Sequence, residues 1–116
     1  MARDAEASST RPTFWLYAIR LDDDILQRRD FRAENPDHLP GKPCFYVGCT
    51  AKTPDERYAE HVHGLPRSSR KVRENHLHLA RRKCLFLGEV TRAEAEAAEA
   101  GYADALRRKG YGVWQR

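Results

Sequence analysis

FYVGCTAKTPDER, residues 45–57, joins a short apolar run to a well-marked helix start. The aromatic and β-branched residues at 45–47 favour a strand. Thr53 then supplies a capping hydroxyl, a proline follows at the first helical position, and Glu56 stands at capping-box spacing. We therefore predict a strand that ends at the following glycine and then a helix over residues 54–63.

Further strand-like segments lie on both sides of this unit. Residues 14–21 are rich in aromatic and aliphatic side chains, which favours a largely buried strand. Residues 22–42 are polar and contain Asn-Pro and Pro-Gly turn signals, so we predict a long excursion between two strands. After the helix, residues 77–79 alternate like a strand, and residues 84–87 are either another strand or the approach to a helix.

A long helix is predicted over residues 91–109, with Thr91 and Glu94 at capping-box spacing and a glycine just beyond its end. At about 100° per residue, one apolar stripe contains Ala95, Ala98, Tyr102, Ala105 and Leu106. Glu99 lies on the shoulder of this stripe. It is either an edge carboxylate that reaches water or pairs with an arginine, or a carboxylate held at a cleft to bind a metal ion.

Composition excludes several classes of protein. The chain has 116 residues, of which 41% are hydrophobic and 33% charged, as in one compact globular domain. No apolar run is long enough to span a membrane, and no signal-peptide pattern is present. The three cysteines, Cys44, Cys49 and Cys84, cannot all pair within the chain and match no disulfide framework. We therefore expect a cytoplasmic protein.

Positive charge is concentrated in one segment of a chain whose net charge is +4. Residues 57–83 contain eight Lys or Arg and two Glu. Such a run is either an ordinary solvated surface or a patch that faces phosphates, since clustered cations gain affinity for a polyanion by releasing its counterions. Charge alone does not choose between the two interpretations.

These elements predict an α/β protein of the α+β type. We expect a small, mainly antiparallel three-stranded sheet flanked by helices. Residues 1–12 are predicted to form a flexible tail and residues 13–116 a single domain, with an insertion at about 22–42.

The order of the elements resembles the GIY-YIG nuclease family. The GIY element reads WLY at residues 15–17, and the YIG element reads YVG at residues 46–48. Arg57 and His61, four residues apart and so on one helix face, match the family's arginine helix in order and spacing. Glu99 falls in the register of its glutamate helix. Each motif is weak alone, but five positions in the right order are much more specific.

The resemblance covers residues 14 to about 114 and has three departures. The first motif has Trp15 in place of its glycine. The gap between the two tyrosines is longer than the family's usual hairpin, which is why residues 22–42 look like an insertion. Many members carry an asparagine about a dozen residues after the glutamate, and residues 109–114, KGYGVW, contain none.

The resemblance implies a set of catalytic residues: Tyr17, Tyr46, Arg57, His61 and Glu99. Glu99 would hold one Mg²⁺, with Mn²⁺ as a substitute. A tyrosine with its ordinary pKa of about 10 is a poor base unless a nearby cation lowers that value, and Arg57 supplies a cation that can also grip the phosphate. Tyr46 is our first choice for the base that accepts a proton from water. His61 either relays a proton or donates a hydrogen bond to the phosphate.

Each of these residues also has an ordinary structural interpretation. Tyr17 and Tyr46 could be common strand aromatics. Arg57 could pair with a glutamate of its own helix, and His61 is one of five histidines. Taken together in the family register, they favour a nuclease site.

Three functions compete. The leading hypothesis is a metal-dependent endonuclease that acts on DNA. The second is a catalytically silent nucleic-acid-binding module of the same fold. The third is a zinc-stabilised interaction domain that uses the three cysteines and a histidine, although a Cys-x4-Cys pair without a second close pair is a poor zinc pattern.

DNA is the expected partner, with Arg67, Arg70, Lys71 and Arg73 on its phosphate backbone. Such binding should be sensitive to salt and tolerant of sequence. Single-stranded DNA is favoured slightly, and branched or damaged DNA stays open. Selectivity would come from the domain itself, from residues 22–42 or from a protein partner; no membrane partner is expected.

Overall fold

The computed structural model describes residues 11–65 and 67–115, so the predicted tail over residues 1–12 lies almost wholly outside the described part. Five strands are described: β1 (Thr13–Leu21), β2 (Cys44–Thr50), β3 (His76–Leu79), β4 (Leu85–Glu89) and β5 (Gly112–Gln115). The helices are α2 (Arg29–Glu34), α3 (Pro54–Val62), α4 (Arg70–Asn75) and α5 (Arg92–Arg108), with short 3-10 turns η1 (Asp23–Gln27) and η2 (Arg81–Lys83).

The strands form one sheet in which β1 is central. Along the sheet the order is β3-β1-β2-β5, and β4 pairs with the other end of β1. All pairs are antiparallel except β2 with β5, which are parallel. The α+β class with a mainly antiparallel sheet is therefore confirmed, and the sheet has five strands where three were expected.

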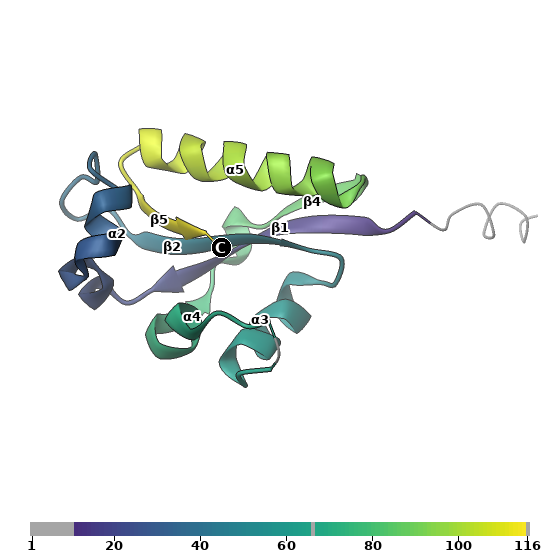
Figure 1. The fold of residues 1–116 in the computed structure, drawn as a ribbon, viewed down its shortest axis with the longest axis horizontal. Coiled ribbons are helices and arrows are strands. Elements are labelled where there is room, and N and C mark those ends of the chain that lie inside the picture. The colour runs from purple at the N-terminus through teal and green to yellow at the C-terminus, as the bar shows by residue number, and fades with distance from the viewer. Residues whose placement is uncertain (1–10, 66, 116) are drawn as a thin grey trace, which may run out of the picture.

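Helices cover the two faces of the sheet unequally (Figure 1). The long helix α5 lies along one face, and the shorter α3 and α4 lie on the other. Because side chains alternate along a strand, successive residues of β1 join different clusters. Tyr17 and Ile19 pack in the cluster on the α3 and α4 side, whereas Leu16 and Ala18 pack toward α5.

Both predicted helix starts are confirmed as capping boxes. The Thr53 hydroxyl accepts from the Glu56 backbone N–H, and the Glu56 carboxylate accepts from the Thr53 N–H. Thr91 and Glu94 make the same reciprocal pair at the start of α5. These bonds satisfy N–H groups that a helix start leaves without partners, and they fix where α3 and α5 begin.

Residues 22–42 contain η1 and α2, where the sequence predicted only a polar excursion. Contacts with β5 explain why this segment forms regular structure. Phe31 of α2 is fully buried with its ring edge against Trp114, 5.4 Å between centroids. Asn35 accepts from the Val113 N–H at 2.7 Å and donates to the Val113 carbonyl at 3.0 Å. Asn35 thereby occupies the outer hydrogen-bonding edge of β5, as a further strand would.

The basic segment contains the other short elements, α4, β3, η2 and β4. The alternation at residues 77–79 is confirmed as β3, and residues 84–87 belong mainly to β4. The prediction that β2 ends at Gly48 is wrong, since the strand continues to Thr50. None of the described helices is long and apolar enough to cross a membrane.

Candidate active site

A buried pair of side chains joins β1 to α3. Tyr17 Oη lies 2.9 Å from Nε2 of His61, and both residues have no exposed surface. The other ring nitrogen, Nδ1, accepts from the Ser69 backbone N–H at 2.9 Å. Because Nδ1 accepts, the proton of the neutral ring is on Nε2, which donates to Tyr17. His61 is thus oriented from both sides, and the hydroxyl proton of Tyr17 is directed elsewhere.

Burial dominates the acidity of Tyr17. It raises the pKa of the phenol well above its ordinary value, and the nearby Tyr46 raises it further, while the charge of Arg57 acts in the opposite direction. The carboxylate of Glu99 also adds to the increase. Tyr17 is therefore a protonated hydroxyl in the free protein, and the cation that the sequence analysis invoked only partly offsets burial.

Gly48 makes room for the Tyr17 ring. The two residues lie opposite each other in the β1–β2 pair. A Cβ added at Gly48 would lie 2.6 Å from Cζ of Tyr17, which is closer than real Cβ contacts. The glycine of the YVG motif is therefore explained by packing against the first tyrosine.

Tyr46 lies beside the same histidine. Its ring centroid is 5.3 Å from that of His61 and 6.3 Å from that of Tyr17. Tyr46 also borders a hollow of about 310 Å³ that is lined by Arg67, Ser68, Ser69, Arg70, Lys71 and Gln115. Of the two tyrosines, Tyr46 is the one that lines a hollow, and 3% of its surface is exposed.

Arg57 is held by two acceptors at the edge of this cluster. One guanidinium nitrogen donates to Glu60 at 2.8 Å and another to the backbone carbonyl of Arg67 at 2.7 Å. Burial disfavours the charged form of Arg57, but the hydrogen bond with Glu60 and the proximity of Tyr17 leave its pKa raised overall. The structural interpretation of Arg57, a pair with its own helix, is thus confirmed for Glu60, and the same cation also acts on Tyr17.

Glu60 bridges Arg57 and a second cation, Lys52. Its carboxylate accepts hydrogen bonds from Lys52 and from Arg57, and these bonds lower its pKa below the ordinary value. The sequence analysis did not select Lys52 or Glu60 for this role.

Glu99 is buried on α5, with 6% of its surface exposed. The predicted stripe is rotated slightly, since the residues of α5 that are buried are Ala95, Glu99, Ala103 and Leu106. The Gln115 side-chain amide donates to Oε2 of Glu99 at 2.9 Å. Gln115 is a late amide that the sequence analysis missed because it searched for asparagine earlier in the chain. Nearby, burial first and then Glu99 raise the pKa of Cys49 to about 11, so the thiol stays protonated.

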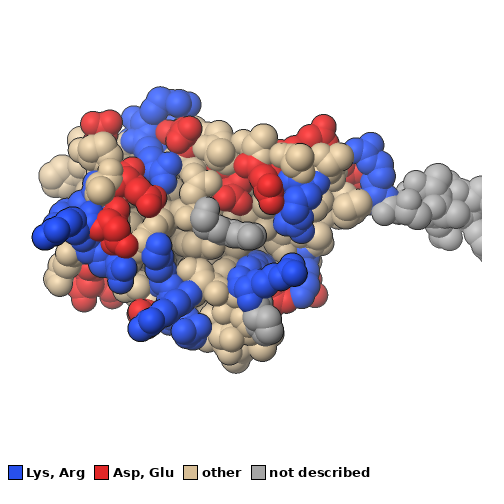
Figure 2. All heavy atoms as spheres, in the orientation of Figure 1, with Lys and Arg blue, Asp and Glu red and all other residues tan. Residues whose placement is uncertain are grey.

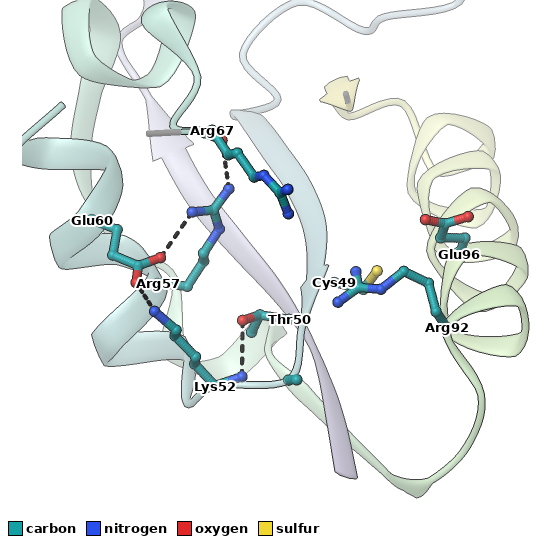
Figure 3. A pocket seen from close by; sticks show the side chains of 9 residues that line it. Cys49, Thr50, Lys52, Arg57, Glu60, Arg67, Arg92 and Glu96 are labelled. Atoms are coloured by element: carbon teal, nitrogen blue, oxygen red, sulfur yellow. Dashed lines mark hydrogen bonds and ion pairs between the residues drawn. The ribbon is translucent and has the colours of Figure 1, made fainter. Parts of the chain in front are cut away.

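A polar hollow of about 350 Å³ lies between Arg57 and Glu60 of α3 on one side and α5 on the other (Figure 3). β5 pairs only with residues 44–47 of β2, and the hollow lies beside the last part of β2. Arg57, Glu60 and Arg67 form one wall and Arg92 and Glu96 of α5 the other, with Cys49 and Thr50 between them. Arg67 also lines the hollow of Tyr46, so the two spaces are neighbours.

The structure brings most of the predicted residues together. Tyr17, Tyr46 and His61 form one cluster, and the charges of Arg57 and Glu99 both act on Tyr17. Glu99 is also bonded to Gln115, which lines the Tyr46 hollow. Among the predicted phosphate contacts, Arg67, Arg70 and Lys71 line the Tyr46 hollow. Arg73 instead lies near Gly64, where its Cδ would be 3.2 Å from an added Cβ.

The donor set decides which metal ion could fit. In residues 11–65 and 67–115, no group of three or more His, Cys, Asp or Glu is placed to hold a metal ion. Mg²⁺ commonly uses one or two carboxylates and fills its other positions with water and substrate phosphates, so Glu99 with Glu96 one turn away fits Mg²⁺. The zinc hypothesis has no such fit, because Cys44 and Cys49 lie in clusters on opposite faces of the sheet.

Comparison of the chain with protein-family models, with curated proteins and with solved structures gave no match.

Proposed function

We propose that the protein is a metal-dependent endonuclease that hydrolyses DNA phosphodiester bonds in the hollow between α3 and α5, as its resemblance to the GIY-YIG family suggests. One observation carries the proposal. A buried tyrosine–histidine pair has a second tyrosine beside it, and both Arg57 and the buried Glu99 lie close enough to Tyr17 to shift its pKa, Arg57 downward and Glu99 upward. These are the groups needed to position a water molecule, neutralise a phosphate and assist a leaving oxygen.

Tyr46 is our proposed base, because it borders the hollow that Arg67 also lines. Arg57 and Arg67 would bind the non-bridging phosphate oxygens. Tyr17 is held by the Nε2–H of His61 and stays protonated, so its hydroxyl is available as a donor to ionised Tyr46. His61 then acts through Tyr17, and its two occupied ring nitrogens favour this role over a direct bond to the phosphate.

Glu99 would hold one Mg²⁺, and Mn²⁺ would substitute for it. When bound, the ion would supply positive charge for the leaving oxygen. Gln115 would fix the orientation of the Glu99 carboxylate through its bond to Oε2. In this role Gln115 would replace the asparagine that many family members carry.

Charge on the surface fits a polyanionic substrate. Figure 2 shows Lys and Arg side chains over α3 and α4, and both acidic and basic side chains along α5. A DNA strand would place its phosphates on the basic side and its scissile bond between the walls. The three free cysteines fit a cytoplasmic setting, which we include in the proposal.

A second candidate is the catalytically silent nucleic-acid-binding module. It is favoured by the commitment of Arg57 to Glu60 and to the Arg67 carbonyl, which leaves this cation partly neutralised. Substrate phosphates would have to compete with Glu60 for Arg57 before the site became active.

Cleavage of labelled DNA by the purified protein distinguishes the two. Single-stranded, duplex and branched substrates would be incubated with Mg²⁺, Mn²⁺ or EDTA. The nuclease proposal predicts cutting that requires the metal ion and stops with EDTA. Binding without cutting under every metal and substrate would contradict it and support the silent module.

A further inference from the structure

We propose that Trp15 and Phe86 form a stacking platform for unpaired bases, so that the substrate is a single strand or a single-stranded part of a structured DNA. This inference rests on the proposed function and deepens it, because it names the form of DNA that enters the hollow.

The platform consists of two aromatic rings that lie side by side on β1 and β4. Phe86 has 58% of its surface exposed, the highest fraction among the large hydrophobic side chains of the described residues. Trp15 is half-buried, and the two ring centroids are 5.1 Å apart at an interplanar angle of 57°. An exposed aromatic pair leaves apolar surface in contact with water, and such a surface is often a binding site. A second flat ring is one ligand that it can bind.

Strand register connects this pair to the hollow. Trp15 pairs with Phe86 on one side and with Thr50 on the other, so the three side chains form a row on one face of the sheet. Thr50 lines the hollow that contains Arg57 and Arg67. Adjacent strands are about 5 Å apart, which puts Phe86 about 10 Å from Thr50, or two to three stacked nucleotides at about 3.4 Å each.

The cations of the hollow and the aromatic rings beside it together favour single-stranded DNA as the ligand. Lys52, Arg67 and Arg92 line the hollow and suit phosphates, whereas the row beyond Thr50 ends in aromatic rings. A strand that crosses from one to the other meets cations and then flat apolar surfaces, which is the alternation that binds single strands without regard to sequence. A paired base already has neighbours on both faces, so duplex DNA cannot use the rings.

Binding to an oligothymidylate of about 15 nucleotides would test the proposal with three variants. F86L keeps an apolar side chain without a ring, F86Y keeps the ring, and L77A alters a comparably exposed side chain on β3, 48% exposed, away from the aromatic pair. An abasic strand of the same length supplies the phosphates without the bases. Tryptophan emission of the unaltered protein would be recorded with both strands, because Trp114 is buried and Trp15 is accessible.

We expect F86L to weaken oligothymidylate binding about tenfold, with F86Y and L77A within about twofold of the unaltered protein. All four proteins should bind the abasic strand and duplex equally, and only the oligothymidylate should quench tryptophan emission. The quenching arm needs no variant, so it decides the matter even where F86L fails to fold. Equal binding by F86L and L77A together with an absence of quenching would overturn the platform.

Cleavage by the same proteins separates this inference from the proposed function. If the unaltered protein cuts DNA and F86L binds and cuts single strands equally well, the nuclease proposal is supported and the platform is rejected. Selective loss of base-dependent binding in a protein that never cuts would keep the platform and reject the nuclease. A change in molecular mass on F86L substitution, with unchanged binding, would show that a second copy of the chain covers the rings and would also overturn it.

Discussion

The two faces of the sheet are built on different principles. Toward α5 most buried side chains are apolar, as in the cluster of Ala18, Phe45, Val47, Ala103, Leu106 and Val113, and Glu99 is the buried carboxylate of that helix. Toward α3 and α4 the core also contains Tyr17, Tyr46 and the fully buried His61. Within the described residues, no buried side-chain nitrogen or oxygen lacks a hydrogen-bond partner. Polar side chains are tolerated in this core because they are hydrogen-bonded. Substitutions among them should therefore cost more stability than similar substitutions in the apolar cluster.

The same Gly-to-Ala substitution should have opposite effects at the buried Gly48 of β2 and at the exposed Gly101 of α5. G48A would push a Cβ into the Tyr17 ring and should lower the free energy of unfolding by about 3 kcal/mol. G101A, in the middle of α5 with nothing within 4 Å, should raise it by about 1 kcal/mol, since alanine favours a helix. Denaturant unfolding of both variants measures the two values. Equal changes in the same direction would contradict the close packing of Gly48 against the Tyr17 ring.

The buried tyrosine–histidine bond should be worth more than an exposed one of the same chemistry. H61L should cost about 2 kcal/mol, because it leaves the Ser69 N–H and the Tyr17 hydroxyl without their partner. A double-mutant cycle of Y17F with H61L should give a coupling of about 1 kcal/mol.

The half-buried pair of Tyr58 and His76 provides the matched cycle. Its Oη–Nδ1 distance is also 2.9 Å, but water can replace the lost bond there. Its coupling should be smaller than that of the buried pair. If the coupling energy of Tyr58 with His76 equals or exceeds that of Tyr17 with His61, burial does not strengthen the tyrosine–histidine bond.

Cations beside the Tyr46 hollow should dominate the salt dependence of DNA binding. R67Q and R70Q should each lower the slope of log affinity against log salt by about 0.7 on a single strand, because both residues line that space. R82Q removes an exposed cation of η2 and serves as control. Affinities at several salt concentrations supply the slopes. Should R82Q change the slope as much as R67Q, binding would depend on total charge and not on the hollow.

The smallest effect concerns the acid stability contributed by Glu60. Its pKa in the folded protein is below the ordinary 4.5, owing to the hydrogen bonds from Lys52 and Arg57. The carboxylate therefore stabilises the fold at pH values above 4.5, and this contribution is lost as the pH falls through the lowered folded-state pKa. At neutral pH the unaltered protein should be more stable than E60Q by less than about 1 kcal/mol. Their melting temperatures should converge as the pH falls through the lowered pKa of Glu60. A gap that is constant with pH would rule out this ion pair as the cause.

Local sequence signals predicted the two main helices well. Two capping boxes, at Thr53 and Thr91, placed both main helices to within a few residues, because helix starts depend on neighbours in sequence. The short helices α2 and α4 escaped prediction, since six residues have little helical preference of their own. They are held by tertiary packing, as Phe31 and Val72 in the core indicate.

The candidate site was predictable only in part for the same reason. Tyr17, Tyr46, Arg57, His61 and Glu99 stand in motif register, so the sequence order could select them. Glu60, Arg92 and Gln115 have no motif; the fold alone brings them to the hollow or to Glu99. The tautomer of His61 likewise depends on a backbone N–H eight residues away, which no spacing rule reveals.

Glu99 is the residue on which the account can be tested most directly. E99Q keeps the shape of the side chain but removes the charge that a metal ion needs, and D104N makes the same change at an exposed carboxylate of α5. The measurement is the rate of DNA cleavage with Mg²⁺, together with DNA affinity, for both variants. We predict that E99Q cuts at least about 100-fold more slowly, binds DNA as before, and that D104N is unchanged. Cleavage by E99Q at the rate of D104N would contradict the proposed site.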